Sequence, residues 1–274
     1  CLVEGDIRNS ADVKKALDGV DAVFHLAAIV SVDFSVKNPL LVNEVNVDGT
    51  LNVLRESLKV GVKRFVYASS CAVYGDPVRL PIDEAHPTRP MSPYAVAKLA
   101  AEHYCRVFCE VYGLETVCLR FFNVYGPRQA IGPYSGVITK FVDRIKRGKN
   151  PIIYGDGGQT RDFVFVRDVI DACLRTLKRK NCVGEIINIG SGVETSINKL
   201  ANVLIGLFGS TRASVKPVYA EARTGDIRRS CADLGRAESL LGYKAKTSLE
   251  EGLSKLLREG KSDCEDCDGE VLHF

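Results

Sequence analysis

The stretch RFVYASSCAVYG, residues 64–75, decides the fold, because a short apolar run ends there in a cluster of polar side chains. Similar apolar runs lie at 21–26 and 116–120, and segments with helical periodicity lie near 40–59 and 92–111. Strand and helix patterns that alternate in this way are typical of a parallel sheet with crossover helices. We therefore predict an α/β fold with a doubly wound parallel sheet.

The chain after residue 130 has a less regular pattern, which predicts a smaller second lobe. A glycine-rich turn stands at 155–158, and helical periodicity predicts helices near 136–147, 167–178, 195–208 and 248–259. Residues 259–274 are polar and acidic and continue no periodic pattern. We expect a disordered tail there.

Composition and charge favour a protein that binds small molecules. Of the 274 residues, 46% are hydrophobic, which is enough for a sizeable core. The 37 Lys and Arg residues nearly balance the 34 Asp and Glu residues, which argues against nucleic acid or an anionic membrane surface as a partner. The sequence has no apolar run that could span a bilayer and no secretory signal pattern, so we expect a soluble, cytoplasmic protein.

The ten cysteines are spread thinly and predict free thiols rather than a disulfide framework. Cys105, Cys118 and Cys173 lie within apolar periodic segments, where a thiol packs as a small hydrophobic group. Cys264 and Cys267 have the spacing of half a metal knuckle or of a disulfide, but no second pair stands near them. We expect a solvated tail and no metal site.

The segment MSPYAVAK, residues 91–98, carries the strongest chemical signal. Pro93 suits the first turn of a helix, and Tyr94 and Lys98, four residues apart, then share one helix face. An ammonium beside a phenol favours the phenolate, so the pair can act as a base near neutral pH. On the spacing alone, a packed ring beside a solvated lysine is the more common interpretation.

Two further motifs favour the catalytic interpretation. The polar end of the stretch at 64–75 and the motif RFFNVYGPRQ at 120–129 each stand where a predicted strand ends. Active-site groups of open α/β sheets collect at the carboxyl ends of the strands. We expect these two strand ends and the helix that carries Tyr94 to meet at one edge of the sheet.

Eight motifs follow one another in an order that resembles the extended short-chain dehydrogenase/reductases acting on nucleotide sugars: GDIRN, HLAA, NVDGT, SSCAVYG, YAVAK, RFFNVYGPRQ, GDGGQTRDFVFVRDV and GDIRRS. The resemblance covers residues 1–258 and is greatest to the UDP-glucose and UDP-N-acetylglucosamine 4-epimerases. It implies NAD as the cofactor and a partial Rossmann-type dinucleotide-binding domain built from residues 1–130 with parts of 160–190. Residues 131–258 would then form mainly the substrate-binding lobe.

The resemblance implies 4-epimerisation of a UDP-hexose. Tyr94 would be the acid/base, Lys98 would hold the nicotinamide ribose and lower the pKa of Tyr94, and Ser70 would hydrogen-bond the reacting sugar oxygen. Oxidation at carbon 4 would give a transient 4-keto sugar, which turns over before the hydride returns to its other face. NAD would be regenerated in each cycle.

The resemblance also implies a set of binding residues. The cofactor contacts would be Asp6, Ile7, Leu26, Ala27, Ala28, Asn46, Tyr94 and Lys98. The substrate contacts would be Ser70, Asn123, Arg161, Arg223, Asp226 and Ser230. Arginine suits a nucleotide diphosphate because its planar fork can donate two hydrogen bonds to phosphate oxygens. His25 lies within a predicted strand and is expected to be a core histidine.

Two positions favour epimerisation over related reactions. Sugar 4,6-dehydratases of the superfamily carry an Asp-Glu pair directly after the residue equivalent to Ser70, and UDP-glucuronate decarboxylases carry a Glu there. This chain has Cys71 and Ala72, neither of which can serve as that carboxylic acid. Ser230 stands where glucose-restricted epimerases place a bulky tyrosine, which leaves room for an N-acetyl group. The alternatives are dehydration, decarboxylation or glucuronate epimerisation of a nucleotide sugar.

The beginning of the chain departs from the family pattern. Family members have a strand, a Gly-x-x-Gly-x-x-Gly turn, a helix and a second strand before the position of GDIRN, and this first βαβ unit is missing here. The chain opens at Cys1 with no methionine before Met91, so we expect a partial sequence, inactive as given because it lacks the pyrophosphate loop. A naturally shortened chain, kept as a binding or structural module, is the alternative.

Family members pair through two helices, so the resemblance also implies a homodimer. The helices near 40–59 and 92–111 would form its interface as a four-helix bundle. The expected small-molecule partner is a UDP-sugar, with neither nucleic acid nor a membrane among the partners.

Overall fold

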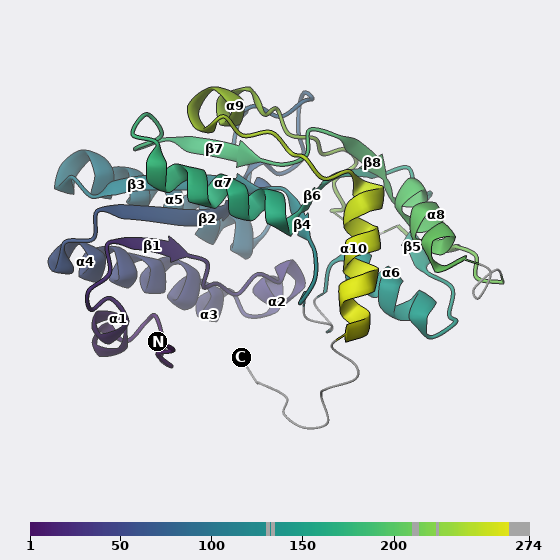
Figure 1. The fold of residues 1–274 in the computed structure, drawn as a ribbon, viewed down its shortest axis with the longest axis horizontal. Coiled ribbons are helices and arrows are strands. Elements are labelled where there is room, and N and C mark those ends of the chain that lie inside the picture. The colour runs from purple at the N-terminus through teal and green to yellow at the C-terminus, as the bar shows by residue number, and fades with distance from the viewer. Residues whose placement is uncertain (130–131, 133–134, 210–213, 223–224, 263–274) are drawn as a thin grey trace.

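The computed structural model describes residues 1–129, 132, 135–209, 214–222 and 225–262. Its largest sheet has four parallel strands in the order β1-β2-β3-β7. These strands, side by side in Figure 1, are β1 (Ala22–His25), β2 (Arg64–Ser70), β3 (Glu115–Phe121) and β7 (Ile186–Ile189). The first three are the strands predicted from the sequence, and their parallel order confirms the predicted α/β class.

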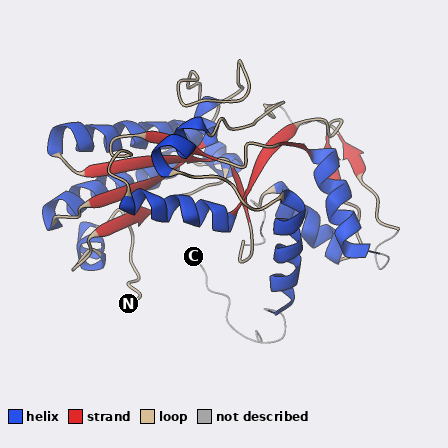
Figure 2. Ribbon diagram, turned by 45° about the horizontal axis from the view of Figure 1, so that its top comes forward, coloured by secondary structure: helices blue, strands red, loops and turns tan. Residues whose placement is uncertain are grey.

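Helices cover both faces of this sheet, as Figure 1 and Figure 2 show. One face packs against α1 (Ser10–Ala16), α4 (Thr50–Val60) and α5 (Pro93–Tyr112), and the other against α7 (Val166–Lys178) and α9 (Gly235–Leu241). Successive strand side chains point to opposite faces, so Phe65 and Tyr67 enter the core beside α5 while Val66 enters the core beside α7. This burial on both sides is the predicted doubly wound arrangement.

A second, smaller core lies beside the large sheet (Figure 1). It contains a three-stranded sheet in the order β4-β6-β8 and the strand pair β5-β9. Its elements are β4 (Asn123–Tyr125), α6 (Val137–Lys146), β5 (Ile152–Tyr154), β6 (Thr160–Phe165), β8 (Glu194–Ser196), α8 (Ile197–Phe208), β9 (Val218–Ala220) and α10 (Leu249–Ser262). Apolar side chains of α6, α8 and α10 pack with those of β6 in one cluster, which is the core of the smaller lobe.

Residues 237–243 pack in the core of the large sheet, although they fall within the range 131–258 that we assign mainly to the smaller lobe. Ala237 and Leu241 of α9 and the following Tyr243 contact the side chains of β3 and β7. The Tyr243 hydroxyl also donates a hydrogen bond to the Gly190 carbonyl at 2.8 Å. The chain therefore returns to the first core after it has built most of the second.

The helical run predicted at 40–59 contains a π-helical turn. The run consists of α3 (Pro39–Asn43), the π turn η1 (Glu44–Gly49) and α4. Gly49 lies so close to Ile7 that a Cβ at this position would stand 2.7 Å from Ile7 Cδ1.

A short helix that the sequence did not reveal, α2 (Val32–Lys37), precedes the run. Its N-cap is Ser31, whose hydroxyl accepts the Phe34 N–H at 3.0 Å.

The last helix extends further than predicted. Helix α10 passes residue 259, where we placed the start of a disordered tail, because helical backbone hydrogen bonding can continue beyond the last apolar turn. Residues 263–274, with Cys264 and Cys267, lie outside the described residues.

In the described part of the chain, eight cysteines are free thiols and no group of His, Cys, Asp and Glu side chains is placed to hold a metal ion. Among those same residues, every helix falls short of the combined length and hydropathy that a bilayer span demands.

Two helical glycines are predicted to respond in opposite ways to alanine. A Cβ at Gly252 of α10 would overlap the Tyr125 hydroxyl, so Gly252→Ala should lower the free energy of unfolding by about 1–3 kcal/mol. A Cβ at Gly206 of α8 would meet nothing within 4 Å, so Gly206→Ala should raise it by about 0.5–1 kcal/mol. Urea unfolding of the two variants measures both shifts. A stabilised Gly252→Ala variant would contradict the packing of α10 on β4.

Candidate active site

Strand β2 and helix α5 meet at the carboxyl edge of the large sheet. Strand β2 ends at Ser70, which is the register partner of Phe121 at the end of β3. Helix α5 begins where the Ser92 hydroxyl accepts the Ala95 N–H at 3.2 Å and Pro93 occupies the first turn, as predicted. The first turn of α5 thus brings its side chains to the end of β2.

The Tyr94 phenol lies against the Ser70 hydroxyl. Only 8% of Tyr94 is exposed, and burial raises the pKa of its phenol to about 12, while a hydrogen bond with Ser70 opposes that rise. The Ser70 oxygen also accepts the Ala72 N–H at 3.2 Å, at the start of the 3-10 turn Cys71–Tyr74. The structure therefore brings together the two groups that the resemblance assigns to the sugar oxygen.

Lys98 lies one helical turn after Tyr94 and is buried, with 3% of its surface exposed. Its Nζ donates a hydrogen bond to the Ala68 carbonyl at 2.8 Å. It lies 4.9 Å from the centre of the Tyr67 ring and 6.0 Å from the centre of the Tyr94 ring. Burial lowers the pKa of the ammonium to about 8, although Cys105 and then Glu102 raise it. Lys98 is therefore mainly charged at neutral pH.

Burial sets the net pKa shift of Tyr94, and the lowering of this pKa by Lys98 stays a prediction. The pKa of Tyr94 is raised, because desolvation of the phenolate raises it more than the hydrogen bond with Ser70 lowers it. The ammonium of Lys98 donates to the Ala68 carbonyl and stands 6.0 Å from the centre of the tyrosine ring. Lys98 still supplies a buried positive charge on the helix face that carries Tyr94.

The loop after β1 presents small and exposed side chains, as expected for a dinucleotide site. Leu26 is 60% exposed, Ala27 is exposed and Ala28 is half-buried. The buried Asn46 of η1 holds this loop, because its side chain accepts the Ile29 N–H at 2.8 Å and donates to the Ile29 carbonyl at 2.9 Å. The side chain of Asn46 therefore holds the loop after β1 by hydrogen bonds to the backbone of that loop.

His25, at the end of β1, is the core histidine that the sequence predicts. Its Nε2 lies 2.9 Å from the Thr50 hydroxyl oxygen. Burial, and to a smaller extent the charge of Lys98, lowers the pKa of the imidazole to about 3. His25 is therefore neutral at physiological pH and packs rather than reacts.

Asp6 and Ile7 lie at the π turn that carries Asn46. Ile7 packs against Gly49. The Asp6 side chain is 45% exposed, and its hydrogen bond with Arg8 lowers the pKa of the carboxyl to about 2. Asp6 is therefore an accessible carboxylate that is charged at all physiological pH values.

These residues fit a nicotinamide dinucleotide at the carboxyl ends of the strands, which is the usual ligand position in open α/β sheets. The charged Asp6 can accept hydrogen bonds from hydroxyl or amine groups of a nucleoside. The exposed turn at 26–28 leaves its backbone accessible. An ammonium can donate three hydrogen bonds, so Lys98 can bind ribose hydroxyls in addition to the Ala68 carbonyl.

Two adjoining cavities share Asn123 in their lining; the larger is also lined by residues 30–33, and the smaller lies within the smaller lobe. The larger has a volume of 740 Å³ and runs between Ser31 and α6, and the smaller has a volume of 220 Å³. The side-chain oxygen of Asn123 is buried and has no hydrogen-bond partner among the described residues. Because an unpaired buried acceptor is costly, this oxygen favours a ligand that donates to it.

Arg161 and Asp226 both line the smaller cavity, and they form an ion pair with each other. Arg161 also donates to the carbonyls of Thr160 at 2.7 Å and Ile227 at 2.6 Å. A bound diphosphate would therefore compete with the Asp226 carboxylate for this guanidinium. The position of the arginine itself is fixed by the two backbone bonds.

The last two substrate residues that the resemblance implies are Arg223 and Ser230. Arg223 lies outside the described residues. Ser230 is 5% exposed and follows Arg229, whose guanidinium forms an ion pair with Glu194 at 2.7 Å. Ser230 is therefore buried, and it lines neither of the two cavities that share Asn123.

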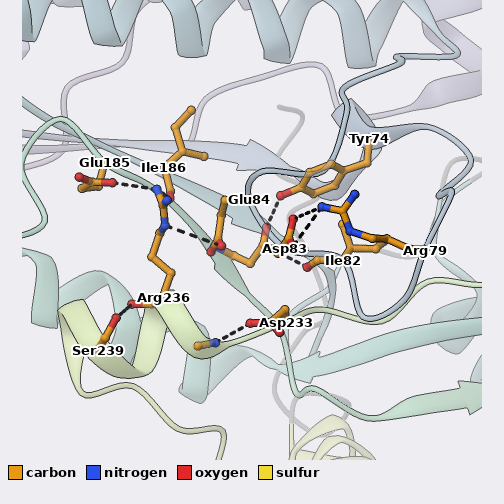
Figure 3. A network of polar contacts seen from close by, with 12 residues as sticks. Tyr74, Arg79, Ile82, Asp83, Glu84, Glu185, Ile186, Asp233, Arg236 and Ser239 are labelled. Atoms are coloured by element: carbon orange, nitrogen blue, oxygen red, sulfur yellow. Dashed lines mark hydrogen bonds and ion pairs between the residues drawn. The ribbon is translucent and has the colours of Figure 1, made fainter.

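A buried polar network, which the sequence did not reveal, holds the loop at 75–92 that connects Ser70 to α5 (Figure 3). The N–H of Asn188 in β7 donates to Glu84 at 2.7 Å, and its side chain donates to the Ile82 carbonyl at 2.9 Å. Arg236 of α9 forms an ion pair with Glu84 at 3.8 Å, and Figure 3 shows the arginine pointing toward this carboxylate. The loop is thus fixed to the large sheet on its way between the two catalytic segments.

Three buried charged residues, Glu102, Arg120 and Asp162, were not among the candidate residues predicted from the sequence. Asp162 accepts hydrogen bonds from the N–H and hydroxyl of Ser191 at 2.7 and 2.6 Å. Glu102 of α5 and Arg120 of β3 form an ion pair at 2.7 Å. Two signals were available, because Glu102 continues the helix face of Lys98 by one turn, and Arg120 and Asp162 stand within quoted motifs.

Comparison with known proteins agrees with this geometry. The family model described as "NAD dependent epimerase/dehydratase family" matches residues 1–190. A putative UDP-glucose 4-epimerase of Methanocaldococcus jannaschii is 41% identical over 267 residues, which cover 96% of this chain and 84% of that protein. The structure of a UDP-glucose 4-epimerase of Thermotoga maritima with UDP-glucose is similar with a TM-score of 0.90 at 37% identity, covering 95% of this chain and 84% of that one.

A third relative extends the comparison to a larger sugar. It is the structure of a UDP-N-acetylglucosamine 4-epimerase from Methanobrevibacter ruminantium M1 in complex with UDP-N-acetylmuramic acid. It has a TM-score of 0.89 at 36% identity and covers 94% of this chain and 82% of that one. The similarity therefore extends over nearly the whole chain.

The buried ammonium of Lys98 predicts that stability depends on pH. Its pKa falls from 10.5 to about 8 on folding, so the unfolded chain binds more protons than the folded chain between these values. Relative to Lys98→Met, the wild type should therefore gain up to about 3 kcal/mol in the free energy of unfolding as the pH rises from 8 to 10.5. Urea unfolding of both proteins across this range measures the difference. A difference that does not change with pH would show that the ammonium is not desolvated.

Proposed function

The chain belongs to the NAD-dependent epimerase/dehydratase family, and we propose that it is a UDP-hexose 4-epimerase. The observation that carries the proposal is the Ser70 hydroxyl against the Tyr94 phenol, with the Lys98 ammonium one turn along the same helix. Such a set can remove a proton from a sugar hydroxyl and return it. The relatives at 36–41% identity, whose names state this activity, support the same choice.

In the proposed reaction Tyr94 accepts the proton of the sugar 4-hydroxyl and later returns it to the same oxygen. Held by Asp6, the turn at 26–28 and Lys98, NAD would supply the acceptor for the hydride of carbon 4 and the source of its return. Ser70 donates a hydrogen bond to the sugar oxygen and holds it against Tyr94. Because burial raises the pKa of Tyr94 to about 12, the positive charge of Lys98 is needed to stabilise the phenolate.

Cys71 and Ala72 favour epimerisation over loss of water. They follow Ser70 directly, where elimination would need a carboxylic acid. Burial raises the pKa of the Cys71 thiol to about 12, so this thiol is a poor proton donor for a departing hydroxyl. The methyl group of Ala72 has no proton to give. The proposed chemistry is therefore confined to one carbon of the sugar.

The diphosphate of the substrate is proposed to bind near Asn123 and Arg161, with Arg223 as a second cation and Asp226 toward the ribose. The two cavities that share Asn123 support this position, since Arg161 and Asp226 line the smaller one and the larger one extends to residues 30–33 of the first part of the chain. The unpaired oxygen of Asn123 can accept a hydrogen bond from a hydroxyl, while its amide donates to a phosphate oxygen. The small side chain of Ser230 is proposed to admit an N-acetyl group at carbon 2.

The proposal includes a cytoplasmic homodimer, in which α4 and α5 of two copies form a four-helix bundle. A groove of 430 Å³ runs between these helices. Helix α5 exposes apolar side chains at Val96, Tyr104, Val107 and Val111, which a second copy can cover. The free thiols of the eight described cysteines support a reducing compartment.

Epimerase activity has a direct test. The protein expressed from its complete gene should interconvert UDP-glucose and UDP-galactose, and their N-acetyl analogues, without added nicotinamide cofactor, because the hydride returns within each turnover. Chromatography of the nucleotide sugars measures both directions. Accumulation of a 4-keto-6-deoxy sugar from these substrates, or of UDP-xylose when UDP-glucuronate is supplied, would contradict the proposal.

Tyr94→Phe is predicted to lower kcat by at least about 100-fold with little change in substrate binding, because a general acid–base group contributes roughly 10²–10⁴ to the rate. Binding should persist, since other residues hold the diphosphate. Tyr112→Phe, at the exposed end of the same helix, is the matched control and should keep the wild-type rate. A Tyr94→Phe variant that retains a tenth of the wild-type kcat would show that another group is the base.

A further inference from the structure

A buried ion pair lies behind the catalytic face of α5. Glu102 is 1% exposed and Arg120 is 3% exposed. The contact is bidentate, since Nε of Arg120 donates to one carboxylate oxygen at 2.9 Å and Nη2 donates to the other at 2.7 Å. The hydroxyl of Ser69 donates to the first of these oxygens as well. One carboxylate therefore satisfies donors from two strands.

This arrangement is more specific than stability alone requires. Two charges lose their hydration when they are buried, and a buried ion pair is often no more stabilising than apolar side chains of the same volume. The ion pair instead fixes geometry, because a bidentate carboxylate–guanidinium contact sets both the distance and the orientation between the two side chains. Apolar packing between a helix and a sheet tolerates small slides.

The position of the pair connects it to the active site. Tyr94, Lys98 and Glu102 are spaced by four residues and share one buried face of α5. Ser69 and Arg120 are register partners on β2 and β3, so Glu102 holds both strands at one level of the sheet. That level is one residue before Ser70. Along the helix axis, at about 1.5 Å per residue, Lys98 lies roughly 6 Å and Tyr94 roughly 12 Å from this anchor.

We propose that Glu102 is a positioning residue that fixes the slide and rotation of α5 on β2 and β3, and so sets the Tyr94 phenol against Ser70. The inference rests on the proposed epimerase function, because it concerns the same two groups. Misplacement of a reacting group by about 1 Å can cost roughly 100-fold in rate, so a small slide of the helix would be visible in kcat. Ser69 and Arg120 act through Glu102 and do not touch the substrate.

The test compares variants of the protein expressed from its complete gene. Glu102→Gln keeps the shape of the side chain but loses a charge-assisted contact, and it should lower kcat at least about 10-fold while KM stays within about threefold. Ser69→Ala leaves the ion pair in place and should lower kcat about three- to tenfold. The double variant should be little worse than Glu102→Gln alone, because both changes remove the same anchor.

A matched control exists at the opposite end of the same two strands. Glu115 forms an ion pair at 2.8 Å with Arg64, its register partner on β2, at the amino edge of the sheet. Glu115→Gln should keep the wild-type kcat. Thermal unfolding of every variant separates stability from rate, since kcat is measured well below each Tm.

The possible outcomes separate the two proposals. A wild type without epimerase activity would overturn the proposed function and this inference with it. An active wild type, with Glu102→Gln and Ser69→Ala both within twofold of its kcat, would overturn only the positioning role and leave the pair as a structural contact. If Glu102→Gln does not fold, Ser69→Ala decides the question, because its Arg120 still has a partner.

Discussion

The contact between helix α5 and strand β2 is the interaction on which the rest of the site depends. Three consecutive residues of the strand meet three residues of the helix that are spaced by four. Lys98 donates to the carbonyl of Ala68, Ser69 donates to Glu102, and Ser70 meets Tyr94. These three contacts join one face of the helix to the carboxyl end of the strand, and the candidate catalytic groups lie there. A shift of one residue in either element would separate every pair.

Burial at this contact has an electrostatic consequence. Desolvation raises the pKa of Tyr94 to about 12 and lowers the pKa of Lys98 to about 8, so each group is pushed toward its neutral form. Proximity of an ammonium does not by itself make the phenol acidic. The acid–base chemistry therefore depends on the low dielectric of a filled site, where a charge on Lys98 and a charge on Tyr94 stabilise each other most strongly.

Much of this structure could be predicted from the sequence, and the rest depends on long-range contacts. The strands at the centre of the fold could be predicted because their apolar runs are short and bounded. Tyr94 and Ser70 could be predicted because they belong to motifs near the ends of strands. The strand β7 and the helix α9 were missed, since their place beside β3 is fixed by tertiary packing and not by a local pattern. The sequence does not distinguish Glu102 from a surface glutamate in a helix. Its role depends on the contacts with Ser69 and Arg120, which only the structure shows. The sign of the pKa shift of Tyr94 also needed the structure, because burial cannot be read from spacing.

The central claim is that the 4-hydroxyl loses its proton, that carbon 4 loses a hydride, and that both return to the same sugar. Epimerisation of UDP-glucose that carries deuterium at carbon 4, followed by proton NMR of the UDP-galactose formed, tests it most directly. Internal return of the hydride predicts that the deuterium remains at carbon 4 of the product. Replacement of the deuterium by hydrogen from solvent would contradict the account, because it would require removal of that atom as a proton.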